Sequence, residues 1–247
     1  MKTLICKVNA EKPEQDIISQ AGKILREGGL VAFPTETVYG LGGNALDAAA
    51  SEKIYAAKGR PSDNPLIVHI ARMEDLEKIV TGVPKKAKIL AEACWPGPLT
   101  MILPKSEEVP YETTGGLDSV AVRYPSHPVA QALILAAGGF VAAPSANTSG
   151  RPSPTTAAHV QEDLTGAVDM ILDGGQVGIG IESTIVDFTE KIPTVLRPGY
   201  ISLEKLKELL GEVKMDKGLL RADASQRPKA PGMKYRHYAP KAELTIV

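Results

Sequence analysis

Short apolar runs alternate with helical segments along most of this chain, and this alternation restricts the fold more than any other feature. Some runs stop at a proline, as Leu30–Phe33 does before Pro34 and Phe140–Ala143 does before Pro144. Some successive strands have no helix between them, so a strict strand–helix repeat is not expected. The pattern predicts an α/β fold of mixed α+β character: a twisted sheet of parallel and antiparallel strands, flanked by helices.

The expected helices cover residues 14–27, 46–57, 74–80, 84–94, 128–137, 155–164 and 203–210. The expected strands cover residues 30–33, 66–70, 99–103, 119–124, 140–143, 170–172, 183–188 and 194–197. The periodic pattern ends at Gly211. We therefore expect one domain over residues 1–211 and a linker or loop over residues 212–247.

Charge is distributed unevenly between these two parts. The net charge of the whole chain is −1, but from Glu212 onward eight Lys or Arg stand against four Asp or Glu. This basic segment is either a solvated linker or a segment that docks on an anionic ligand or RNA.

Composition excludes several classes of protein. No apolar run approaches the roughly 20 residues that a membrane-spanning helix needs, and no secretory leader is apparent. The chain has two cysteines and four histidines, too widely spaced to suggest a disulfide framework or a zinc site. We therefore expect a protein of the reducing cytoplasm.

Cations and hydroxyls follow two of the expected elements. Lys58-Gly59-Arg60 comes after a helix, and Ser145-Ala146-Asn147 comes after a strand. A guanidinium fork and an ammonium suit phosphate oxygens, so together the two segments could hold a phosphorylated ligand. Each has a plainer interpretation: a cation pair favoured by a helix C-terminus, and a polar turn.

Three further positions are candidates for binding a small substrate. Thr35-Glu36-Thr37 follows a strand, and its hydroxyls and carboxylate suit an ammonium or hydroxyl group; it could also be an ordinary polar loop. His69 lies within an apolar strand and could simply be a core residue. Arg123 lies within an apolar strand and needs an anionic partner, either a substrate carboxylate or a protein carboxylate.

Familiar nucleotide and hydrolase motifs are absent. The Gly-rich run Gly174–Gly180 lacks the G-x-G-x-x-G order, and it could be a flexible hairpin. The sequence has neither a G-x-x-x-x-G-K-[ST] loop nor a G-x-S-x-G elbow. A nucleotide would therefore be held by some other arrangement of loops.

The motifs in their order resemble the YrdC-like family of L-threonylcarbamoyladenylate synthases. They are P-T-E-T-x-Y-G-L-G at Pro34–Gly42, K-x-R at Lys58–Arg60, N-P-L-x-x-H at Asn64–His69, W-P-G-P-x-T at Trp95–Thr100, R-x-P at Arg123–Pro125, S-A-N-x-S-G at Ser145–Gly150 and E-S-T-I at Glu182–Ile185. The resemblance extends from about Ile17 to Gly199, and it implies the YrdC-like fold. The run Gly232–Pro240 resembles the linker of the long form of this family. Because the chain ends soon afterwards, we expect the further C-terminal domain of the long form to be missing, with residues 212–247 forming a linker or lid.

The resemblance implies an enzyme, a nucleotidyltransferase. It would form threonylcarbamoyl-AMP and pyrophosphate from L-threonine, bicarbonate and ATP, with Mg²⁺ accompanying ATP. The product would serve N6-threonylcarbamoyladenosine modification of tRNA through a downstream transferase complex. We expect no membrane partner, and a contact with tRNA is a further option.

The resemblance also implies the site residues. Those expected to bind L-threonine are Thr37, His69, Arg123, Ala143 and Ser183. Those expected to bind ATP are Lys58, Arg60, Asn64, Ser119, Ser145, Asn147, Ser153, Arg197, Tyr235 and His237. Lys58 and Arg60 are the expected catalytic residues, Tyr235 and His237 the expected lid, and no side chain is assigned to a metal.

Two other functions remain open at this point. The basic C-terminal segment would suit a double-stranded RNA or tRNA-binding module without adenylation activity, although the low net charge of the chain disfavours this as the main role. A sugar-phosphate enzyme would need carboxylates clustered around magnesium, and the candidate loops carry cations and hydroxyls instead.

Overall fold

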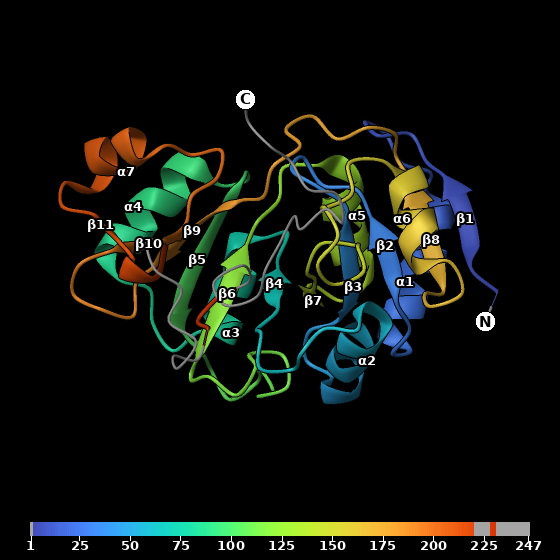
Figure 1. The fold of residues 1–247 in the computed structure, drawn as a ribbon, viewed down its shortest axis with the longest axis horizontal. Coiled ribbons are helices and arrows are strands. Elements are labelled where there is room, and N and C mark those ends of the chain that lie inside the picture. The colour runs from blue at the N-terminus through green and yellow to red at the C-terminus, as the bar shows by residue number, and fades with distance from the viewer. Residues whose placement is uncertain (1, 220–227, 231–247) are drawn as a thin grey trace, which may run out of the picture.

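Eleven strands form one sheet in a computed structural model that describes residues 2–219 and 228–230. The sheet runs across the whole molecule in the order β1-β8-β2-β3-β7-β4-β6-β5-β9-β10-β11 (Figure 1). The strands are β1 (Leu4–Lys7), β2 (Val31–Phe33), β3 (Gly40–Asn44), β4 (Ile67–His69), β5 (Leu99–Pro104), β6 (Ser119–Arg123), β7 (Val141–Ala142), β8 (Met170–Asp173), β9 (Thr184–Asp187), β10 (Thr194–Arg197) and β11 (Lys214–Met215).

Parallel and antiparallel pairings are mixed within this sheet, which confirms the predicted fold class. β4 runs parallel to β6 but antiparallel to β7, and β5 runs parallel to β9 but antiparallel to β6. The register places Arg123 of β6 between His69 of β4 and Thr100 of β5. Residues opposite each other in a sheet project from the same face, so these three polar side chains are neighbours.

Helices cover the two faces of the sheet. They are α1 (Gln15–Arg26), α2 (Ala48–Lys58), α3 (Leu76–Ile79), α4 (Lys85–Cys94), α5 (Pro128–Ala136), α6 (Ala157–Leu164) and α7 (Leu203–Leu210), with 3₁₀ turns η1 (Met73–Asp75) and η2 (Lys217–Leu219). Ile18 of α1 and Leu133 of α5 pack with Val31 in one buried cluster, whereas the next strand residue, Ala32, belongs to a second cluster with Ile54 of α2. Because strand side chains alternate between faces, the two clusters lie on opposite sides of the sheet.

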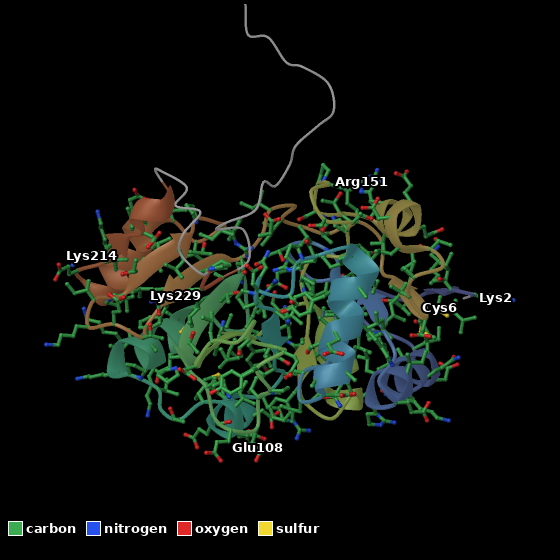
Figure 2. All side chains as sticks on the ribbon, turned by 60° about the horizontal axis from the view of Figure 1, so that its bottom comes forward. Lys2, Cys6, Glu108, Arg151, Lys214 and Lys229 are labelled. Carbon is green, nitrogen blue, oxygen red and sulfur yellow. The ribbon has the colours of Figure 1, made fainter. Side chains whose placement is uncertain are left out.

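A third, smaller cluster lies on the same face as α1 and α5, farther along the sheet. It contains Ile67 of β4 and Ala121 of β6, together with Ala230 from the C-terminal part of the chain. Ala230 is fully buried there, and Lys229 (labelled in Figure 2) lies 3.0 Å from the carboxylate of Asp187. Residues 228–230 are therefore attached to this face of the sheet.

The end of α2 determines where two of the predicted cations point. The Asp47 side chain caps the start of the helix by accepting a hydrogen bond from Ala49 N at 2.9 Å. Gly59 ends the helix in the left-handed conformation, with φ of 57°, and Arg60 N donates to Tyr55 O at 2.9 Å. Lys58 is thus the last helical residue, and the chain turns sharply between Lys58 and Arg60.

Sequence reasoning missed the strand β3 because glycine is a poor strand former. Gly42 has no Cβ for a specific reason: one built there would lie 2.9 Å from Val141 Cγ1 and 3.0 Å from Phe33. The short strands β1 and β11 were also not predicted. β11 and η2 fall within the predicted linker, and β11 pairs in parallel with β10. Residues 220–227 and 231–247 of that linker lie outside the described residues.

Across the described residues, no helix combines the length and the apolar character that crossing a membrane requires.

Candidate active site

One pocket collects residues from seven separate segments of the sequence. Eight of its lining residues were predicted site residues: Thr37, Arg60, His69, Arg123, Ala143, Ser145, Ser183 and Arg197. The other lining residues are Thr35, Val38, Tyr39, Gly40, Ile67, Pro144 and Glu182. Because Ile67 lies inside β4, the pocket extends from the loops onto the surface of the sheet. Arg60 and Ser145, about 85 residues apart in the chain, line the same pocket.

The loop after β2 is fixed by hydrogen bonds on both sides. Within the loop, Thr35 Oγ1 donates to Val38 O at 2.6 Å and accepts from Thr37 N at 3.2 Å. From outside, Ile179 N donates to Glu36 O and Gly180 N donates to Thr37 O, both at 2.9 Å. The Gly-rich run that the sequence left open as a flexible hairpin therefore ends in a segment that braces this loop.

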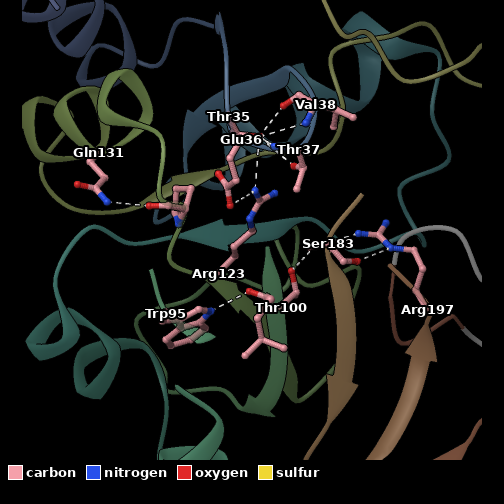
Figure 3. Close-up of polar contacts among 12 residues, drawn as sticks. Thr35, Glu36, Thr37, Val38, Trp95, Thr100, Arg123, Gln131, Ser183 and Arg197 are labelled. Carbon is pink, nitrogen blue, oxygen red and sulfur yellow. Dashed lines mark hydrogen bonds and ion pairs between the residues drawn. The ribbon is translucent and has the colours of Figure 1, made fainter. Parts of the chain in front are cut away.

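Arg123 lies at the end of β6 and points into this loop (Figure 3). Its side chain is 5% exposed, and its Nη2 lies 2.8 Å from Glu36 Oε1 and 3.4 Å from Thr35 Oγ1. The Nε atom is buried and has no hydrogen-bond partner within the described part of the chain. Of the two partners left open by the sequence, the structure shows a protein carboxylate, and one donor of the guanidinium is still unused.

His69 is buried beside Arg123 and is neutral at ordinary pH. Burial, and then the positive charge of Arg123, lower its pKa from 6.5 to about 3. Its Nδ1 lies 3.0 Å from Ile67 O, and because a carbonyl oxygen only accepts, Nδ1 carries the ring proton. The ring therefore adds a polar surface to the pocket without adding charge.

Arg197 and Ser183 also line the pocket, and Figure 3 shows their side chains in contact. Arg197 Nη2 donates to Ser183 Oγ and its Nε donates to Ser183 O, each at 3.1 Å. Ser183 Oγ also lies 2.7 Å from Thr100 Oγ1 on β5. A network of hydroxyls thus links Arg197 of β10 to the strand beside Arg123.

Lys58 is buried behind the pocket instead of lining it. Its Nζ donates to Ser145 O at 2.5 Å and to Asn147 O, and it lies 3.4 Å from Asn147 Oδ1. Burial, and next the charge of Arg60, lower the pKa of this amine well below its usual value. In this arrangement Lys58 ties the end of α2 to the Ser145–Asn147 loop.

Asn147 also supports that loop from behind. It accepts from Ser145 Oγ at 2.5 Å, and its Nδ2 donates to Thr148 O at 2.9 Å and to Arg151 O at 2.8 Å. Its side chain is therefore committed to local hydrogen bonds.

Asn64, Ser119 and Ser153, three further predicted ATP residues, do not line the pocket. Asn64 accepts through its main-chain oxygen from Arg60 Nη2 at 3.2 Å. Ser119 starts β6, on the same face as Arg123, and Ser153 Oγ donates to Glu182 Oε1 at 2.6 Å. Tyr235 and His237 lie outside the described residues.

Glu182 was not among the predicted site residues, and the Glu36 carboxylate was predicted only to suit an ammonium or hydroxyl group, although both residues belong to motifs quoted above. Glu36 lies within P-T-E-T and Glu182 within E-S-T-I. Glu182 lines the pocket, and Glu36 contacts Arg123. The motifs could have indicated both residues, because a carboxylate close to predicted cations is expected to pair with one of them.

Comparisons with known proteins show the family of this chain. The family model Sua5/YciO/YrdC, described as "Telomere recombination", matches residues 23–199. The chain belongs to this family. Over 99% of its length it is 53% identical to a threonylcarbamoyl-AMP synthase of Pyrococcus abyssi, and over 93% it is 54% identical to a threonylcarbamoyl-AMP synthase of Bacillus subtilis. It spans 72% and 66% of the lengths of these two relatives.

A solved structure supports the same relationship. The crystal structure of P. abyssi Sua5 complexed with L-threonine superposes with a TM-score of 0.94 and 54% identity, covering 98% of this chain and 70% of that one. The predictions of a threonylcarbamoyl-AMP synthase family member and of a nucleotidyltransferase are thereby confirmed.

The prediction that the C-terminal domain is absent is wrong. A second family model, described as "Threonylcarbamoyl-AMP synthase, C-terminal domain", matches residues 201–247. The prediction failed because it looked for a folded domain beyond residue 247. The match instead starts before α7 and includes residues that lack the apolar periodicity on which the sequence reasoning relied.

Proposed function

We propose that this chain forms threonylcarbamoyl-AMP and pyrophosphate from L-threonine, bicarbonate and ATP. One observation carries the proposal. A single pocket is lined by the buried Arg123, by the polar side chains of Thr37, His69 and Ser183, and by two further arginines, Arg60 and Arg197. The resemblance in fold and sequence to a structure complexed with L-threonine supports the same substrate here.

The amino-acid subsite is proposed at Arg123. The Arg123 guanidinium, which lines the pocket, would bind the carboxylate of L-threonine, while Thr37, His69 and Ser183 would contact its amine and hydroxyl. Ala143 belongs to the same wall and would contribute its main chain. A neutral His69 suits this role because it can hydrogen-bond a hydroxyl without repelling the ammonium group.

Arg60 and Arg197 are proposed to bind the phosphates of ATP, together with the Ser145 hydroxyl. Negative charge grows on pyrophosphate as the carbamate oxygen attacks the α-phosphorus, so guanidinium groups at this position lower the barrier. Asn64, which contacts Arg60, and Ser153, which contacts Glu182, would meet the rest of the nucleotide together with Ser119. Lys58 and Asn147 would act by holding Ser145 in place.

The protein would contribute to this reaction mainly by positioning the substrates. The neutral amine of threonine adds to the carbon of bicarbonate with loss of water, and the resulting carbamate displaces pyrophosphate from ATP. Each reacting group is already a fair nucleophile or leaving group, so holding the three substrates together supplies much of the acceleration. Lys58 and Arg60 are accordingly proposed as the residues whose loss affects catalysis most.

Mg²⁺ is proposed to arrive with ATP. Within residues 2–219 and 228–230, no group of three or more His, Cys, Asp or Glu side chains could hold a metal ion. Mg²⁺ commonly binds through substrate phosphates, water and one or two carboxylates, so this donor set suits a metal bound to the triphosphate. Its role there would be to neutralise phosphate charge.

Tyr235 and His237 are proposed to cover the nucleotide as a lid that keeps water from the mixed anhydride. Support comes from residues 228–230, since Lys229 pairs with Asp187 and Ala230 is buried on the sheet face that carries Ile67 of the pocket. The product would pass to a tRNA-modifying transferase in the cytoplasm.

The decisive experiment measures pyrophosphate release from ATP and bicarbonate with each of several amino acids, with mass detection of the adenylate. We expect release that depends on L-threonine. Release without any amino acid would refute the proposal. Absence of release together with steeply salt-dependent tRNA binding would favour an RNA-binding module instead.

A further inference from the structure

Glu36 is a buried carboxylate placed against the arginine of the proposed amino-acid subsite. Its Oε1 lies 2.8 Å from Arg123 Nη2. Figure 3 marks this ion pair by a dashed line. Both carboxylate oxygens are buried, and apart from this ion pair neither has a hydrogen-bond partner among the described residues. A charge in this position affects whatever Arg123 binds.

The main chain holds Glu36 firmly in place. Its carbonyl oxygen accepts from Ile179 N at 2.9 Å, and the adjacent residues are fixed by the Thr35 hydroxyl and by Gly180 N. The carboxylate therefore stays close to Arg123 without needing a ligand to order it.

The amino-acid end of the pocket is then electrically balanced before substrate arrives. Arg123 contributes one positive charge and Glu36 one negative charge, while His69, with a pKa of about 3, contributes none. Burial also lowers the pKa of His127, although the charge of Glu36 acts in the opposite direction. The charge in direct contact with Arg123 is therefore that of Glu36.

Such a pair distinguishes a zwitterion from a simple anion. A carboxylate bound to Arg123 can place its α-ammonium group within about 6 Å of Glu36, by ordinary bond lengths and hydrogen-bond distances. An opposite charge at about 4–6 Å favours the charged group by roughly one to three powers of ten. An anion without an ammonium group gains nothing from Glu36 and is repelled by it.

We propose that Glu36 is a specificity-determining residue that makes the Arg123 subsite select a zwitterionic amino acid over simple anions. Glu36 does not line the pocket, so it acts through Arg123 and through its electric field. The inference rests on the proposed function, in which the other substrates and the product are all anions. An uncompensated Arg123 would attract bicarbonate, phosphate or pyrophosphate into the place of threonine.

The test compares two ligands that differ only in the ammonium group. L-Threonine and (R)-3-hydroxybutyrate are titrated calorimetrically, without ATP, into the wild-type protein and into Glu36→Gln. In the wild type we expect the hydroxy acid to bind at least tenfold more weakly. In Glu36→Gln, which keeps the shape but removes the charge, we expect the ratio of the two dissociation constants to fall about tenfold.

Asp75→Asn is the matched control, because Asp75 is another buried carboxylate in an ion pair, with Lys78 at 2.8 Å, and it does not line the pocket. This variant should leave the ratio unchanged. A fall of less than threefold in folded Glu36→Gln overturns the inference. If that variant does not fold, the wild-type titration decides: binding of the hydroxy acid within threefold of threonine overturns it too. Since no turnover is measured, failure of pyrophosphate release would count against the proposed function alone.

Discussion

Replacing Lys58 with methionine tests whether this lysine holds the active-site loop or acts on the nucleotide directly. Methionine keeps most of the aliphatic stem but removes the amine that donates to Ser145 O and Asn147 O. A buried acceptor left unsatisfied costs about 1–3 kcal/mol. Two acceptors are affected, and removing the amine also removes the cost of burying it. We therefore expect the free energy of unfolding to fall by about 2–4 kcal/mol.

Thermal unfolding followed by circular dichroism measures this loss. At about 2–4 °C per kcal/mol for a chain of this size, the Tm should fall by roughly 5–15 °C. Pyrophosphate release should fall as well, because Ser145 loses its support. Lys53→Met is the matched control: Lys53 is exposed on the same helix, where its amine donates to Gly28 O, and its Tm should change little. An unchanged Tm in Lys58→Met, with activity lost, would show that the amine acts on the substrate and would refute this reasoning.

Three further predictions concern other parts of the site. Arg60→Ala should lower pyrophosphate release by about 100-fold or more, while L-threonine binding measured by calorimetry stays within threefold, because Arg60 is assigned to the phosphates. The unfolded chain protonates His69 below pH 6.5, whereas the folded chain does so only near pH 3. The unfolded state thus binds more protons between these values, so lowering the pH from 7 to 5 should cost about 2 kcal/mol of stability in urea unfolding, a loss absent from His69→Gln. Removing residues 231–247 should weaken ATP retention or speed hydrolysis of the adenylate, observed by mass spectrometry.

Each of these has an outcome that contradicts it. Threonine binding lost together with turnover in Arg60→Ala would place Arg60 at the amino-acid end. Equal losses of stability in the wild type and in His69→Gln would show that His69 is not buried as a neutral ring; His159→Gln, at an exposed histidine, serves as the control. Unchanged kinetics after the truncation would eliminate the lid.

The sequence predicted most of the fold because its strands are apolar and its helices end at clear signals. α7 was predicted with its bounds as observed, and β2 ends at Phe33, just before Pro34, as expected. β3 was missed because its glycines are required by close packing against Phe33 and Val141, and such contacts between distant segments leave no periodic pattern. The C-terminal part was misjudged for a related reason: residues that match a known domain can lack the apolar periodicity of a helix or strand.

Convergence of the site was predictable, but the direction of individual side chains was not. Lys58 and Arg60, two residues apart, were both expected to hold phosphate oxygens of a ligand. Instead Lys58 is the last residue of α2 and Gly59 is left-handed, so Lys58 turns inward to the Ser145–Asn147 loop while Arg60 lines the pocket.

The same limit applied to Arg123, for which the sequence left two anionic partners open. The folding of the Thr35–Thr37 loop decides which carboxylate pairs with this buried guanidinium. In the structure Glu36 contacts one side of Arg123, and Nε has no partner among the described residues. A motif therefore indicates which residues meet, whereas the hydrogen bonds around them decide which of them contacts the substrate and which holds another residue in place.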